Sequence, residues 1–134
     1  MNRLRGQILS VRTHQGTSLV ECGTPAGTLT SVVLDTPESA PWLAVGQELS
    51  LLFKESEVWM LPGGARFIPH CLKGEVESIH EGELLARVAC RTDGGRVTSL
   101  VDRDWLARLA LSVGDAIELG VHPAAVALQM EGEA

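Results

Sequence analysis

The chain has 134 residues, of which 45% are apolar, 21% charged and 4% aromatic, the profile of a globular protein with one ordinary domain or two very small ones. Its 11 basic and 17 acidic side chains give a net charge of -6, which disfavours a general attraction to nucleic acid or anionic lipid. No apolar run approaches the roughly 18 residues of a membrane-spanning helix, and the first residues lack the apolar stretch of a signal peptide. We therefore expect a cytoplasmic protein without a membrane partner.

The three cysteines, Cys22, Cys71 and Cys90, stand in no CxxC spacing, which favours buried thiols over a disulfide framework or a zinc ribbon. The sequence has no nucleotide-binding glycine motif, no GxSxG nucleophile elbow and no zinc-ligand spacing. We predict a protein that is not an enzyme and that holds neither a metal ion nor a cofactor.

An internal repeat covers nearly the whole chain. With a constant offset of 68 and no gaps, 15 of the 59 positions from 4 to 62 are identical to their counterparts, including Leu4 with Leu72 and Thr30 with Thr98. Chance would give only about a third of that number. A segment rich in Pro and Gly, residues 63–70, reads as a linker. We therefore predict one module over residues 1–62 and a second over residues 71–134.

Short strands dominate both copies. The first strands are predicted at residues 4–11 and 72–79, and the second at 18–22 and 84–90, with turns at Gly16 and Gly82. The third strands are predicted at 29–33 and 97–101. A hairpin turn over residues 93–95 precedes the latter, since Gly accepts the positive φ that such turns require.

A short helix is predicted between the third and fourth strands of each copy. In the second copy apolar residues recur at helical spacing over residues 103–109, with Asp102 as the N-cap. In the first copy Thr36 is placed as an N-cap and Pro37 at the first helical position, while Pro41 ends the helix early.

Apolar residues then alternate over 49–53 and 117–121, which predicts fourth strands and puts Lys54 and His122 on the face away from the core. About five strands with one short helix is the element order of the OB-fold. We therefore predict an all-β chain of two tandem OB-like five-stranded barrels, each with one short helix. Because a 60-residue module is marginal alone, we also expect a homo-oligomer, a dimer or a trimer.

Several segments resemble the Mop module, the molybdate-binding member of the TOBE family. They are residues 98–101 (TSLV) and 109–115 (LALSVGD) in the second copy, and 30–33 (TSVV) and 43–47 (LAVGQ) in the first. The tandem pair resembles a di-Mop protein. The resemblance implies OB-like barrels that bind molybdate or tungstate at interfaces between modules or subunits. It implies a cytoplasmic oxyanion-binding protein for storage, homeostasis or sensing, with no cofactor besides this ligand.

An oxyanion site needs several hydrogen-bond donors and a cation. The family's basic residue after the fourth strand is Lys54 in the first copy and His122 in the second, and Asn2 is what remains of its opening Ser-Ala-Arg-Asn. Leu34 and Asp102 stand where the family has Ser or Thr, and a carboxylate repels a dianion. The candidate ligands are Asn2, Arg3, Thr30, Ser31, Lys54 and Ser56 in the first copy, and Thr98, Ser99 and His122 in the second.

The charges favour the first copy as the binding half. Residues 1–66 carry 5 basic and 6 acidic side chains, a net charge of -1, whereas residues 67–134 carry 6 and 11, a net charge of -5.

Two other classes of function remain open at this point. One is a regulatory or oligomerisation module that has lost the anion site and acts through protein contacts. The other, OB-type binding of single-stranded nucleic acid, needs a basic groove and stacking aromatics, so we expect no direct nucleic-acid partner.

Overall fold

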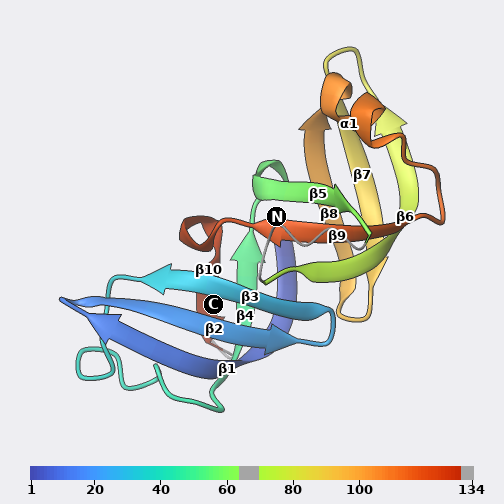
Figure 1. Ribbon diagram of the computed structural model, residues 1–134. Coiled ribbons are helices and arrows are strands. Elements are labelled where there is room, and N and C mark those ends of the chain that lie inside the picture. The colour runs from blue at the N-terminus through green and yellow to red at the C-terminus, as the bar shows by residue number, and fades with distance from the viewer. Residues whose placement is uncertain (64–69, 131–134) are drawn as a thin grey trace.

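The structure, a computed structural model, describes residues 1–63 and 70–130. Most of the predicted linker, residues 64–69, lies outside the described residues. The ten strands of the described residues form one antiparallel sheet that curls into two barrels at opposite ends of an elongated molecule (Figure 1). This arrangement confirms the predicted all-β class with two OB-like barrels.

The first barrel contains the four leading strands of the chain. They are β1 (Asn2–His14), β2 (Thr17–Thr24), β3 (Gly27–Val33) and β4 (Glu48–Phe53). A fifth strand, β10 (Ala127–Met130), comes from the far end of the sequence, and the order across the sheet is β10-β4-β1-β2-β3.

The second barrel repeats this order with the elements of the second copy. Its strands are β5 (Val58–Pro62), β6 (Leu72–Glu81), β7 (Leu85–Thr92), β8 (Gly95–Asp102) and β9 (Ala116–Val121), arranged β5-β9-β6-β7-β8. The two barrels meet at one backbone pairing, between Gly27 of β3 and Leu72 of β6.

The two copies exchange their fifth strands. Strand β5 belongs to the first copy in sequence but pairs with β9, as in Val58 opposite Val121. Strand β10 belongs to the second copy but pairs with β4, as in Ala127 opposite Leu52. In Figure 1 the green β5 accordingly lies against the red β9. The sequence repeat at 1–62 and 71–134 therefore does not coincide with the two barrels, because each barrel is completed by the other copy.

A serine hydroxyl joins the two edge strands of each barrel. Ser31 of β3 donates to the carbonyl oxygen of Val126 at 2.6 Å, directly before β10. Its repeat counterpart Ser99 of β8 donates to the carbonyl oxygen of Val58 at 2.7 Å, at the start of β5. Both serines are buried. The hydroxyls thus fasten each exchanged strand to the barrel that receives it.

The predicted helix is present in the second copy and absent in the first. Helix α1 (Arg103–Leu109) begins after Asp102, whose Oδ1 accepts a hydrogen bond from the Trp105 N–H at 2.7 Å. In the first copy the corresponding segment forms turns, so that prediction is wrong. Pro37 and Pro41 lie only four residues apart, and Pro41 has no N–H and disfavours helical geometry before it. Among the described residues no helix is long and apolar enough to cross a membrane.

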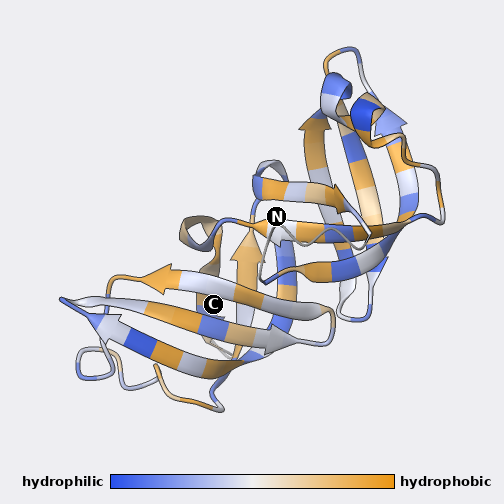
Figure 2. Cartoon of the chain, viewed as in Figure 1, coloured by the Kyte–Doolittle hydropathy of each residue, from blue (hydrophilic) through white to orange (hydrophobic). Residues whose placement is uncertain are grey.

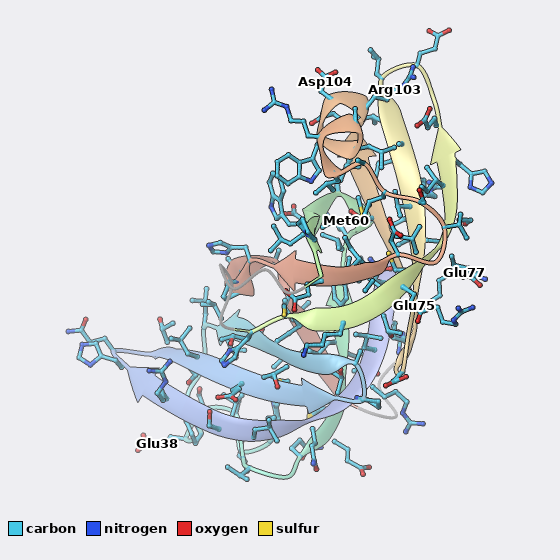
Figure 3. All side chains as sticks on the ribbon, turned by 45° about the vertical axis from the view of Figure 1, so that its right-hand side comes forward. Glu38, Met60, Glu75, Glu77, Arg103 and Asp104 are labelled. Carbon is cyan, nitrogen blue, oxygen red and sulfur yellow. The ribbon has the colours of Figure 1, made fainter. Side chains whose placement is uncertain are left out.

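A continuous apolar core runs through both barrels. Alternate residues of the strands point inward, which gives the alternating colours along the arrows in Figure 2. Met60 of the exchanged β5 is fully buried, and Figure 3 shows it inside the second barrel. The largest buried side chains are Phe53, Leu4, Ile8, Leu29, Leu49, Leu51, Met60, Leu72, Ile117 and Leu119.

Candidate functional site

The strand exchange divides the predicted ligand residues between two composite interfaces, each built from both copies. We call the first the lysine interface; it contains Asn2, Lys54 and Ser56 from the first copy and Thr98, Ser99 and Asp102 from the second. We call the second the histidine interface; it contains the counterparts at the offset of 68, which are His70, His122 and Ala124 with Thr30, Ser31 and Leu34. Lys54 therefore shares an interface with Thr98 and Ser99, and not with Thr30 and Ser31.

Asn2 holds the lysine interface together. Its Nδ2 donates to the carbonyl oxygen of Thr98 at 2.9 Å, and its Oδ1 accepts from the Thr98 N–H at 2.9 Å. The side chain is buried, and Asn2 pairs with Phe53, the residue before Lys54. Asn2 thereby brings the end of β4 to the middle of β8.

Lys54 and the 3-10 helix η1 (Glu55–Glu57) form the rim of this interface. Lys54 and Ser56 are exposed, and the Lys54 side chain does not cap η1. Ser56 lines a cavity of about 170 Å³ between η1, β5, β8 and α1. The other residues that line this cavity are Val58, Trp59, Leu100, Val101, Asp102 and Trp105.

Glu55 and Asp102 of the lysine interface have basic or donor partners, whereas the Glu57 carboxylate of η1 is exposed and has no partner among the described residues. Glu55 Oε1 lies 3.1 Å from Arg87 Nε on β7, and Glu55 Oε2 lies 4.0 Å from the Met1 ammonium. Asp102 is engaged as the N-cap of α1 through Trp105. These contacts offset the charges of Glu55 and Asp102 beside Lys54.

The polar side chains of the histidine interface form hydrogen bonds with neighbouring protein groups. His70 Nδ1 lies 2.9 Å from the Thr30 hydroxyl, and His70 Nε2 lies 3.9 Å from a Glu21 carboxylate oxygen. His122 Nδ1 accepts the Ala124 N–H at 3.0 Å and so caps the 3-10 helix η2 (Pro123–Ala125). Arg3 belongs to neither interface; its Nη2 donates to Gln129 Oε1 at 2.9 Å.

Two tryptophans beside the lysine interface were missed by the sequence reasoning. The rings of Trp59 and Trp105 meet edge to face with centroids 5.8 Å apart. Within the described part of the chain, the buried Nε1 of Trp105 has no hydrogen-bond partner. Their repeat counterparts are Ala127 and Pro37. The sequence signal for the two tryptophans was therefore that neither of them is repeated in the other copy.

The cysteines behave as structural thiols. Cys22 and Cys90 are buried, and burial together with nearby Glu21 and Glu77 raises the pKa of each thiol to about 11. Burial also raises the pKa of Cys71. In residues 1–63 and 70–130 no group of three or more His, Cys, Asp or Glu side chains is placed to hold a metal ion.

Two open hollows lie at repeat-related positions beside the β2–β3 and β7–β8 hairpins. One is lined by Arg5 and Glu48, and the other by Lys73 with a paired Arg91 and Glu75 whose nitrogen and oxygen lie 3.1 Å apart. Both signs of charge line each hollow. Neither contains a predicted ligand residue.

Comparisons with known proteins agree with the two-module architecture. The sequence profile of the TOBE domain matches residues 1–60 and 68–128. The fold is similar to a crystal structure of the cytoplasmic molybdate-binding protein ModG with molybdate bound, with a TM-score of 0.84 and 25% sequence identity. The match covers 96% of this chain and 95% of that chain. No curated protein sequence matches this chain.

Proposed function

Because the chain belongs to the TOBE domain family, we propose that it is a cytoplasmic oxyanion-binding protein that takes up molybdate or tungstate for storage, homeostasis or sensing. The observation that carries this proposal is the match over nearly the full length of both chains to ModG, a molybdate-binding protein. The proposed role is reversible binding, without catalysis.

The lysine interface supplies the chemistry that such a ligand requires. A tetrahedral dianion is held by several hydrogen-bond donors and a positive charge. Lys54, Ser56 and Thr98 offer an ammonium and two hydroxyls, and within the described residues these groups have no other hydrogen-bond partner. The remaining candidates serve other purposes here, since Ser31 and Ser99 donate to carbonyl oxygens of the exchanged strands.

Titration calorimetry with molybdate, tungstate and sulfate tests the proposed function. We expect saturable binding of molybdate and tungstate and much weaker binding of sulfate. In thermal unfolding, ligand at a thousandfold its dissociation constant should add about 4 kcal/mol to the free energy of unfolding. No binding, or equal binding of sulfate, would contradict the proposal and favour a module that acts through protein contacts alone.

We further infer that the chain self-associates. Several large apolar side chains are exposed, and contact with a second copy of the chain would remove their apolar surface from water. They include Leu34, Val45, Leu84 and Val113, each more than 60% exposed. Light scattering should give a mass that is a multiple of 14.3 kDa. A purely monomeric chain at micromolar concentration would contradict this inference.

A further inference from the structure

We infer that the two repeat-related interfaces are not equivalent, and that this chain binds one oxyanion, at the lysine interface, while the histidine interface stays empty. The inference rests on the proposed function and assigns the site within it. It follows from comparing four pairs of positions related by the offset of 68.

The first pair is Lys54 and His122. The Lys54 ammonium is exposed and makes no cap to η1, so it is available to an anion. The Nδ1 of His122 accepts the Ala124 N–H, which requires an unprotonated nitrogen at that position. The lysine interface therefore has a cation that its counterpart lacks.

Two hydroxyls show the same asymmetry. Ser56 faces the cavity beside η1, whereas its counterpart Ala124 has no donor side chain. Asn2 bonds the backbone of Thr98 and leaves the hydroxyl available, whereas His70 bonds the hydroxyl of Thr30 directly. The lysine interface thus offers two hydroxyl donors, and the histidine interface offers neither.

The carboxylates need a separate comparison, because Asp102 lies at the lysine interface and its counterpart Leu34 is apolar. Asp102 caps α1 at 2.7 Å, and Glu55 is paired with Arg87. Glu57 of η1 is exposed, and its carboxylate has no partner among the described residues, whereas its counterpart Ala125 is apolar. At the histidine interface Glu21 lies 3.9 Å from His70 and compensates any positive charge on that ring. An incoming dianion therefore meets an available cation only at the lysine interface.

Calorimetry with molybdate on two single variants tests the assignment. Lys54→Ala should weaken binding at least tenfold, because it removes the only cation assigned to the anion. Lys73→Ala is the matched control: it removes the other lysine of the chain, outside both interfaces, and should change the affinity less than twofold. Equal effects of the two variants, or two equivalent anions per chain in the unsubstituted protein, would overturn the inference. No molybdate binding by the unsubstituted protein would instead reject the proposed function itself.

A graft of the lysine interface onto its counterpart provides an independent test. The triple variant His70→Asn, His122→Lys and Ala124→Ser copies three positions of the lysine interface, and should raise the number of molybdate ions bound per chain from about one to two. Trp59 and Trp105 line the cavity of the first site alone, so only the first equivalent should change their fluorescence. A folded triple variant that still binds a single anion would overturn the inference. If the triple variant does not fold, the comparison of Lys54→Ala with Lys73→Ala tests the inference on its own.

Discussion

Hydrogen bonds between the two barrels join residues of the first copy to residues of the second, and those between Asn2 and Thr98 are an example. Asn2→Ala should lower the free energy of unfolding by about 1 to 3 kcal/mol, since it leaves a partly buried N–H and carbonyl of Thr98 without their partner. Chemical denaturation measures the change. Arg3→Ala is the control, because Arg3 is exposed and should lose no more than about 0.5 kcal/mol. Equal losses in the two variants would contradict the role of Asn2.

Asp102 combines a structural role with an unfavourable charge. Asp102→Asn keeps an N-cap oxygen for the Trp105 N–H and removes a negative charge from the cavity wall. We expect unchanged stability and a molybdate affinity higher by roughly fivefold, since charges a few ångströms apart in water interact by about 1 kcal/mol. Asp102→Ala separates the two roles, because loss of the cap should cost about 1 kcal/mol of stability. Unchanged affinity in Asp102→Asn would place the anion elsewhere.

The buried thiols of Cys22 and Cys90 should resist alkylation. With a pKa of about 11, only about one thiol in a thousand is ionised at pH 8, and the thiolate is the reactive form. Cys71 is only partly buried and should react first. A colorimetric thiol assay should therefore find at most one fast thiol in the folded chain and three after denaturation. Rapid reaction of all three would contradict the buried placement.

The same thiols make stability depend on pH on the alkaline side. Their pKa is raised in the folded state, so the folded chain holds these protons more tightly than the unfolded chain. The free energy of unfolding should therefore fall as pH rises from about 9 to about 11. The double variant Cys22→Ala and Cys90→Ala should lack this part of the decline, and a profile identical to that of the parent chain would contradict the assignment.

At the scale of elements, the exchange of β5 and β10 makes the two copies dependent on each other. A fragment of residues 1–62 lacks β10, which covers the edge of β4, and Val126, which accepts the Ser31 hydrogen bond. We expect this fragment alone to lack a cooperative unfolding transition by circular dichroism. Mixed with residues 71–134 it should regain β-sheet signal and cooperative unfolding. A fragment that folds alone would show that the copies are independent modules.

Most elements could be predicted because their signals are local. Alternation located the strands, and helical spacing with the Asp102 cap located α1. Gly6 and Gly74 are identical in the repeat for a steric reason: a Cβ would lie 2.5 Å from the Gly23 carbonyl oxygen and 2.7 Å from that of Arg91. The exchange could not be predicted, because alternation shows which face of a strand is buried and not which strand lies beside it.

The grouping of the candidate ligand residues in space could not be predicted from the sequence. Lys54 and Ser56 were placed with Thr30 and Ser31 because all four lie in one copy. In the structure the chain crosses to the other barrel after η1, so Ser56 lines a cavity with residues of β8. Lys54 follows Phe53, the sheet partner of Asn2, whose side chain bonds to Thr98 of β8. The grouping of these residues depends on the pairing of β5 with β9, and that pairing joins residues distant in sequence.

On the scale of the whole molecule, the acidic excess of the second copy lies partly on the outer face of its barrel. Glu75 and Glu77 project there from β6, as Figure 3 shows, and pair with Arg91 at 3.1 Å and Arg96 at 2.8 Å. The Arg96 hydrogen bond also holds the pKa of Glu77 below its usual range. Exposed pairs of this kind are screened by solvent and add little to stability. Each of these pairs is neutral overall, and Lys54 lies apart from them, between β4 and η1.

The central claim is that an oxyanion binds where the two copies interlock. Anomalous diffraction at the molybdenum edge from crystals grown with molybdate tests it most directly, because the metal is located without reference to the protein chain. We predict one strong anomalous peak per chain beside Lys54, Ser56 and Thr98. A peak at His70 and His122, or no peak near Lys54 in crystals that contain bound molybdate, would contradict the account.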